Sequence, residues 1–209
     1  MFPSDILSTY LLAVLLVVLA PGPDNILAIG RGLSQGPWAA ALSSIGAGLG
    51  IMLHTLAATF GLALALQASP AAFWVVKAVG AAYLLWIGIR AIRARGLISL
   101  EPSARQPLPK VFLTGLLSNV LNPKPGLFVV AFIPQFVAPE RGSVPVQMLV
   151  YGAIFAVLTT LIFTLLGASA ARLTALLARR PRTVAALNVG AGLTFIGAGL
   201  SVLALDRRT

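Results

Sequence analysis

Hydrophobic residues form six long runs along the chain, separated by short connections rich in Gly, Pro, Ser and charged residues. A bilayer core of about 30 Å needs about 20 apolar residues in a helix. The runs cover residues 4–30, 38–66, 71–89, 111–136, 144–171 and 183–205. The pattern therefore predicts an all-α integral membrane protein with six transmembrane helices.

Composition supports a membrane location, because 58% of the residues are hydrophobic and only 10% are charged. Soluble domains carry roughly 25% charged residues. Lipid must therefore cover much of the outside. The net charge of +10 comes from residues between the runs, without interleaved aromatics, which indicates membrane topology and not nucleic-acid binding. The absence of Cys excludes disulfides and Cys-ligated metals, and no pattern calls for a cofactor.

Lys and Arg are distributed unequally between the connections. Three of them, Arg141, Arg207 and Arg208, lie on the side of the termini. Ten lie on the opposite side: Arg31, Arg90, Arg93, Arg95, Arg105, Lys110, Arg172, Arg179, Arg180 and Arg182. Cytoplasmic loops carry the excess of basic residues, so both termini are predicted to lie outside. A five-span arrangement, with termini on opposite sides, is the alternative.

The longest connection divides the chain into two halves of three runs each. We assign residues 1–92 to a first repeat, 93–109 to a cytoplasmic linker and 110–209 to a second repeat. Because three is odd, the second half must enter the membrane in the opposite orientation. Both halves carry a Pro-x-Pro segment in their first run, at 21–23 and 123–125. The sequence therefore predicts a 3+3 inverted repeat.

Each Pro-x-Pro segment interrupts a hydrophobic run. Pro removes a backbone donor and clashes with the carbonyl one turn earlier, so helices 1 and 4 are predicted to be broken. Broken helices are tolerated in a bilayer only beside protein or a watery cavity. A matched pair of interrupted helices points to a transporter binding site. A simple Pro kink is the alternative interpretation.

Residues at the two breaks form the candidate binding site. Asn122 suits a helix N-cap with Pro123 at the first helical position, and Gly22 or Asp24 can cap the segment that begins near Pro23. A helix start presents N–H groups and a positive dipole end, which favour an anion such as a carboxylate. The predicted substrate-binding residues are Pro21, Gly22, Pro23, Asp24, Asn25, Asn122, Pro123 and Lys124.

Asp24 and Lys124 place opposite charges inside hydrophobic runs. Such charges cost at least about 2.5–3.5 kcal/mol and are functional candidates, with a mutual structural ion pair as the alternative. Asp24 and His54, the only histidine, are the candidates for carrying a coupling proton; a packed or hydrogen-bonded His54 is the competing interpretation. One His without an acidic cluster cannot build a metal site. No nucleophile–base pair is evident, so the sequence does not indicate an enzyme.

Small residues line one face of the second run: Ser43, Ser44, Gly46, Gly48 and Gly50. Faces of this kind allow membrane helices to pack closely, and they also permit a homodimer.

Several short motifs occur in order along nearly the whole chain. They are Ala20-Pro21-Gly22-Pro23-Asp24-Asn25, Arg31-Gly32, Gly36, Gly46, Gly50, His54, Gly80-Ala81-Ala82-Tyr83-Leu84-Leu85-Trp86-Ile87-Gly88, Gly115-Leu116-Leu117, Asn119, Asn122-Pro123-Lys124 and Pro134-Gln135-Phe136. In these motifs the chain resembles the LysE/RhtB family of amino-acid exporters. The resemblance implies a multi-pass protein of the bacterial inner membrane that exports amino acids such as lysine, threonine, homoserine or leucine on the proton gradient. Pro125 departs from the small residue expected after Asn-Pro-Lys.

Residues and resemblance together predict a proton-coupled secondary exporter of an amino acid or close derivative, with the lipid bilayer as its surroundings. The substrate carboxylate is expected at a half-helix N-terminus beside Lys124, and the ammonium at Asp24 and freed carbonyls. One alternative is a membrane scaffold or subunit that transports nothing. The other is an ion or metal transporter of the wider superfamily, for which only Asp24 supplies a carboxylate.

Overall fold

The computed structural model describes residues 2–20, 22–68 and 104–170, together with scattered positions between 78 and 93 and between 172 and 200. Every regular element in these ranges is helical, and they contain no strand. The all-α prediction is therefore confirmed for the part of the chain that the structure describes.

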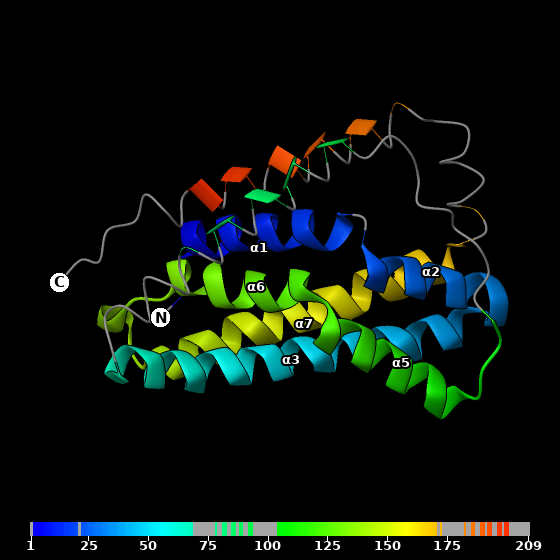
Figure 1. Cartoon of the computed structure of the whole chain (residues 1–209), viewed down its shortest axis with the longest axis horizontal. Coiled ribbons are helices and arrows are strands. Elements are labelled where there is room, and N and C mark those ends of the chain that lie inside the picture. The colour runs from blue at the N-terminus through cyan, green and yellow to red at the C-terminus, as the bar shows by residue number, and fades with distance from the viewer. Residues whose placement is uncertain are drawn as a thin grey trace.

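The described elements are six α-helices and two 3-10 turns (Figure 1): α1 (Ser4–Leu19), α2 (Pro23–Gln35), α3 (Pro37–Ala68), α5 (Leu108–Leu121), α6 (Pro123–Ala131), η1 (Ile133–Phe136), η2 (Pro139–Arg141) and α7 (Val144–Ala168). α3 and α7 are each long and apolar enough to cross a membrane. Two bent pairs are also long and apolar enough when each is counted as a single span: α1 with α2, and α5 with α6 and η1. The predicted spans 71–89 and 183–205 lie outside the described residues, apart from scattered positions.

Both helix pairs change direction at a proline. α1 ends at Leu19 and α2 begins at Pro23, and the two helices are bent by 61°. α5 ends at Leu121 and α6 begins at Pro123, with a bend of 52°. Each of these prolines occupies the first position of the new helix, where its missing N–H is not needed. Pro21, the other predicted breaker of the first run, lies outside the described residues.

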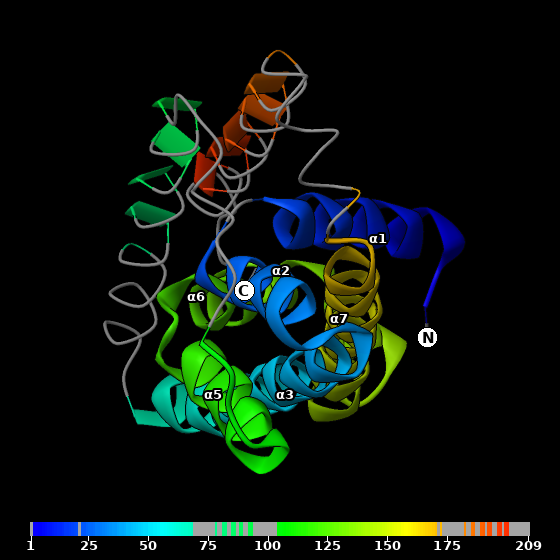
Figure 2. The same cartoon turned by 90° about the vertical axis from the view of Figure 1, so that its right-hand side faces the viewer.

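α3 is the central helix of the bundle. It packs along α5 and α7 and also contacts α2 and α6, while α1 lies across the bundle (Figure 2). The connection from α2 to α3, the start of α5 and the end of α7 lie at one end of the molecule (Figure 1). The starts of α1 and α7 lie at the other end. The α1–α2 pair and the α5–α6 pair therefore run in opposite directions.

The small residues of α3 allow the backbone of α5 to approach closely. A Cβ on Gly46 would overlap the Phe112 carbonyl and would lie 2.7 Å from the Leu116 nitrogen. In the opposite sense, a Cβ on Gly115 would overlap the Ser43 carbonyl. Only glycine leaves space for backbones at this separation. The close packing predicted from the small-residue face is confirmed.

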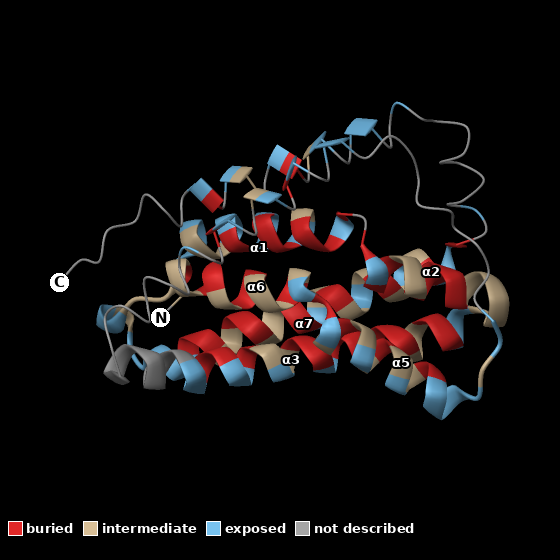
Figure 3. Ribbon diagram, viewed as in Figure 1, coloured by how far each residue is buried: buried red, intermediate tan, exposed pale blue. Residues whose placement is uncertain are grey.

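Large apolar side chains remain exposed on the outside of the bundle. Leu12, Phe60, Leu161 and Leu165 are each more than half exposed. Buried residues concentrate on the sides of the helices that face each other (Figure 3). An outside of this kind would be unstable in water and suits contact with lipid.

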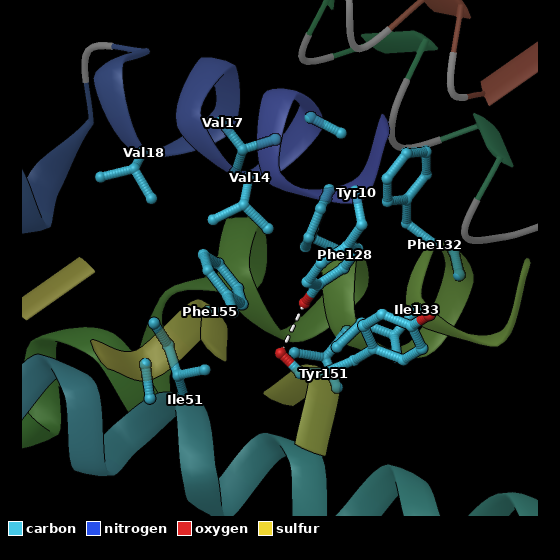
Figure 4. Close-up of a cluster of buried hydrophobic side chains, with 14 of the residues drawn as sticks. Tyr10, Val14, Val17, Val18, Ile51, Phe128, Phe132, Ile133, Tyr151 and Phe155 are labelled. Carbon is cyan, nitrogen blue, oxygen red and sulfur yellow. Dashed lines mark hydrogen bonds between the residues drawn. The ribbon is translucent and has the colours of Figure 1, made fainter. Parts of the chain in front are cut away.

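Aromatic side chains anchor α1 to the bundle (Figure 4). Tyr10 is fully buried, and its hydroxyl donates to the backbone oxygen of Tyr151 at 2.6 Å. The Tyr10 ring meets the rings of Tyr151 and Phe136 edge-on, with centroids 4.6 and 5.1 Å away. Phe128 packs in the same way on Phe155 of α7. These contacts join α1 to η1 and α7, and α6 to α7.

The described end of the central linker is bound to the end of α2. Arg31, only 3% exposed, donates to the Ala104 carbonyl at 2.6 Å and to Gln106 Oε1 at 2.8 Å. Gln35 donates to the Gln106 carbonyl at 2.8 Å and accepts from the Gln106 nitrogen at 2.9 Å. The start of α5 is thereby fixed relative to α2.

Replacing Gly46 by Val should destabilise the protein by about 1–3 kcal/mol, because α3 and α5 must separate to accommodate the side chain. Gly61→Val is the matched control on the same helix, since a Cβ there meets no described residue within 4 Å. Thermal unfolding of the detergent-purified protein measures both. An equal loss of stability in the two variants would show that α3 and α5 do not depend on this contact.

Candidate functional site

Asp24, in the first turn of α2, is a buried carboxylate held by the other helix break. Ser118 Oγ donates to Oδ1 at 2.8 Å. Asn119 Nδ2 and Asn122 Nδ2 both donate to Oδ2, at 2.7 and 3.0 Å. The three donors belong to the last turn of α5 and the cap of α6, and all are neutral. They compensate the carboxylate for the water it loses on burial.

Lys124, in the first turn of α6, reaches in the opposite direction. Its ammonium donates to the carbonyl of Ala20 at 2.8 Å, one of the carbonyls left free at the end of α1. A Cβ on Gly22 would lie 3.0 Å from Lys124 Nζ, so the absence of a side chain at Gly22 makes room for the ammonium. Among the described residues no ion pair joins Asp24 to Lys124; each charge is bound by groups of the opposite break.

An asparagine organises each break. Asn122 caps α6, as predicted, because its side-chain oxygen accepts from the Lys124 nitrogen at 3.0 Å. Asn25 accepts from the Gly22 nitrogen at 2.8 Å and donates to the Ala20 carbonyl at 2.9 Å. Gly22 is the N-cap residue of α2, the first of the two capping residues considered from the sequence.

The two helix starts differ in the N–H groups that they present. The first turn of α2 contains the backbone N–H groups of Asp24 and Asn25, and the earliest N–H groups of a helix have no acceptor within it. In α6, positions one and three are Pro123 and Pro125, which have no N–H, and the Lys124 N–H is already bound to the cap. An anion therefore finds backbone donors at α2 and only the Lys124 side chain at α6.

A small cavity lies where the two breaks meet. One part of its lining is polar and combines Asp24, Asn25, Asn119, Asn122 and Lys124. The rest is largely apolar, with Thr159 as its polar member: Val17, Val18, Ile51, Pro125, Phe155, Thr159 and Phe163. An apolar wall with a few convergent polar groups is typical of a binding site for a small molecule.

Four of the predicted binding residues line this cavity: Asp24, Asn25, Asn122 and Lys124. Gly22 adjoins the Lys124 ammonium, whereas Pro23 and Pro123 begin helices and do not line the cavity. Pro21 lies outside the described residues.

His54 lies beside the cavity and not in its lining. Its Nε2 donates to the backbone oxygen of Asn119 at 3.1 Å. The ring packs on α6, since a Cβ on Gly126 would lie 2.9 Å from His54 Cε1. Asn119 therefore lies between His54 and Asp24. Its backbone carbonyl accepts from His54, and its side-chain amide donates to Asp24.

Sequence reasoning did not assign three residues of the site. Ser118 and Asn119 stand four and three positions before Asn122 in an otherwise apolar stretch, which places them on one helix face. A polar face of this kind inside an apolar helix indicates that these side chains point toward a polar site. Thr159 gave no signal, because Thr is common in membrane helices and ordinarily bonds to its own backbone.

The apolar helices define a helical membrane protein, and the two helix breaks enclose a small cavity with a partly polar lining. The chain belongs to the LysE type translocator family, whose family model matches residues 15–205. It is therefore a transporter and not an enzyme, and the resemblance seen in the sequence is confirmed.

Relatives cover nearly the whole chain. A homoserine/homoserine lactone efflux protein of Salmonella typhi is 32% identical over 191 residues, which is 91% of this chain and 92% of the relative. An uncharacterized membrane protein of Pseudomonas aeruginosa is 32% identical over 200 residues, 93% of each chain. A leucine efflux protein of Enterobacter sp. (strain 638) is 26% identical over 193 residues, 90% of each chain. No solved structure matches the chain.

Variants of Asn122 should separate its two bonds. Asn122→Ser keeps a capping oxygen but is too short to reach Asp24, whereas Asn122→Asp keeps the cap and places a second carboxylate beside Asp24. Asn122→Asp should therefore lower the melting temperature more than Asn122→Ser. Melting in detergent measures both. If Asn122→Asp is as stable as the wild type, the side chain does not lie against the Asp24 carboxylate.

Proposed function

We propose that this protein is a proton-coupled secondary exporter of an amino acid or close derivative, with its transport site at the two helix breaks. One observation carries the proposal: the charged side chain at each break is hydrogen-bonded by groups that belong to the other break. Asp24 is bound by Asn119 and Asn122, and Lys124 is bound by Ala20. The relatives that are named as amino-acid efflux proteins support both the substrate class and the direction of transport.

A free amino acid is complementary to this arrangement. Its carboxylate binds at the start of α2, where backbone N–H groups, the positive helix end and the Lys124 ammonium come together. Its ammonium binds Asp24 and the Ala20 carbonyl. This assignment refines the expectation from the sequence, because the two prolines leave the start of α6 without free N–H groups.

Each interrupted pair acts as one broken transmembrane span in this proposal, and the halves 1–92 and 110–209 form an inverted repeat. The opposite directions of α1–α2 and α5–α6 support it (Figure 1). The cavity is small, so an amino acid enters only when the halves move apart. Rocking of one half against the other then exposes the site to each side of the membrane in turn.

The proposed orientation in the bacterial inner membrane has both termini outside. The end of the molecule at which α5 begins then faces the cytoplasm, and Arg31, Arg105 and Lys110 lie there. The opposite end contains Arg141 in η2. This arrangement agrees with the excess of basic residues in cytoplasmic loops.

Asp24 and His54 are the candidate carriers of the coupling proton. Protonation of Asp24 would release the substrate ammonium, since a neutral carboxyl attracts it only weakly. His54 is connected to Asp24 through Asn119, so a change in its charge acts on the same network.

Counterflow in proteoliposomes with a panel of about twenty amino acids tests the function directly. Accelerated uptake of one or a few amino acids into preloaded vesicles is expected, together with stimulation by a proton gradient. A membrane scaffold would give no flux with any member of the panel, and a correctly folded protein without flux would end the proposal.

Asp24→Asn and Lys124→Met should each reach the membrane in normal amounts and reduce flux at least about tenfold. An Asn at position 24 can still accept from Asn119 and Asn122 and donate to Ser118, so only the charge is lost. Asp5→Asn and Lys110→Met are matched controls, because both residues are exposed and lie away from the cavity.

The double variant Asp24→Asn/Lys124→Met distinguishes a transport site from a structural pair. If the two charges only stabilise each other, the single variants misfold and the double variant regains both folding and flux. A transport site leaves the double variant folded and inactive. Near-normal flux in the double variant would refute the assignment of both residues.

A further inference from the structure

The hydroxyl of Thr159 is a buried polar group for which the described residues supply no hydrogen-bond partner. Thr159 lies on α7, is 2% exposed and lines the cavity at the helix breaks. Its Oγ1 has no hydrogen-bond partner among the residues that the structure describes. A buried hydroxyl without a partner is unfavourable, so its position in the lining of the cavity requires an explanation.

Other hydroxyls in these helices bond to the carbonyl one turn earlier. Thr55 donates to Ile51, Thr59 to Thr55 and Thr160 to Ala156, at 2.7 to 2.9 Å. This is the ordinary arrangement for Thr in a membrane helix. Thr159, next to Thr160 on the same helix, departs from it. Its hydroxyl therefore keeps its full hydrogen-bonding capacity in a residue that lines the cavity.

The neighbours of Thr159 indicate what that molecule presents. Phe155 and Phe163 stand one turn before and one turn after it on α7, and both line the same cavity. Within the lining, charge is confined to Asp24 and Lys124 at the helix breaks. A charged substrate group beside Thr159 would therefore lack a counter-charge, whereas a neutral hydrogen-bonding group would be accommodated.

We propose that Thr159 is the specificity-determining residue of the cavity and binds a hydrogen-bonding atom on the side chain of a small, neutral amino acid. The inference rests on the proposed function, since Asp24 and Lys124 must hold the α-ammonium and α-carboxylate for the side chain to extend toward α7. The phenylalanines pack on its methylene or methyl groups. Amino acids with basic or acidic side chains are excluded, and an apolar side chain of the same shape leaves the Thr159 hydroxyl unpaired.

Two pairs of amino acids isolate this contact, because the members of each pair differ by exchange of a hydroxyl for a methyl: threonine with valine, and homoserine with norvaline. Counterflow rates in proteoliposomes of the wild-type protein should favour the hydroxyl member about tenfold, as expected when a site leaves a polar group unpaired with the wrong substrate. Thr159→Val, which keeps the shape and removes the hydroxyl, should lower that ratio about tenfold. Thr159→Ser should retain the preference.

Thr160→Val is the matched control, since Thr160 does not line the cavity and its hydroxyl is already bound. It should leave both ratios unchanged. Thr159→Val should keep or raise the wild-type melting temperature, because the hydroxyl that it removes has no partner among the described residues and is unfavourable when buried. A large drop would show a structural role and overturn the inference.

The outcomes separate this inference from the proposed function. If the wild type transports both members of each pair equally, or Thr159→Val leaves the ratio unchanged, the protein is an amino-acid transporter and Thr159 does not determine specificity; a bound structural water then satisfies its hydroxyl. If the folded wild type transports no amino acid of the twenty-member panel, the proposed function fails and the role of Thr159 fails with it.

Discussion

An unpaired backbone group inside a bilayer costs several kcal/mol, and this constraint governs the structure. Two prolines that begin helices, Pro23 and Pro123, leave such groups at both breaks. The fold pairs them locally through asparagine caps and across the breaks through Lys124, whose ammonium binds the Ala20 carbonyl. Asp24 is satisfied by the opposite break in the same way. Each break therefore depends on the other for its bonds, and helices far apart in the sequence must meet at one place.

Packing elsewhere holds the breaks in that position. The glycine contact between α3 and α5 brings the last turn of α5 against the centre of the bundle, where a Cβ on Gly50 would lie 2.6 Å from Asn119 Oδ1. Asn119 can then donate to Asp24 and accept from His54. On the other side, Tyr10 fixes α1 on α7. The site is thus a consequence of close backbone packing as much as of its polar residues.

If Asp24 and Lys124 form the proposed transport site, binding each charge through neutral groups suits it better than a direct ion pair does. Separating a buried ion pair leaves two uncompensated charges and costs several kcal/mol. Amides, hydroxyls and carbonyls can exchange their bonds for those of a zwitterion at a smaller cost, since each group offers more than one bonding direction. In the proposed transport site, Asp24 and Lys124 therefore stay compensated in the empty protein and can exchange these partners for substrate.

The sequence by itself determined the all-α membrane class, the family, the cap at Asn122 and the presence of two charges, Asp24 and Lys124, at the helix breaks, because hydropathy, proline chemistry and charge are properties of local composition. Only the tertiary structure decided which groups bind those charges, and that Thr159 lines the cavity without a partner for its hydroxyl among the described residues. Such contacts depend on how one helix is rotated and placed against another. That rotation is set by the summed packing of many side chains, so a single residue's spacing does not reveal it.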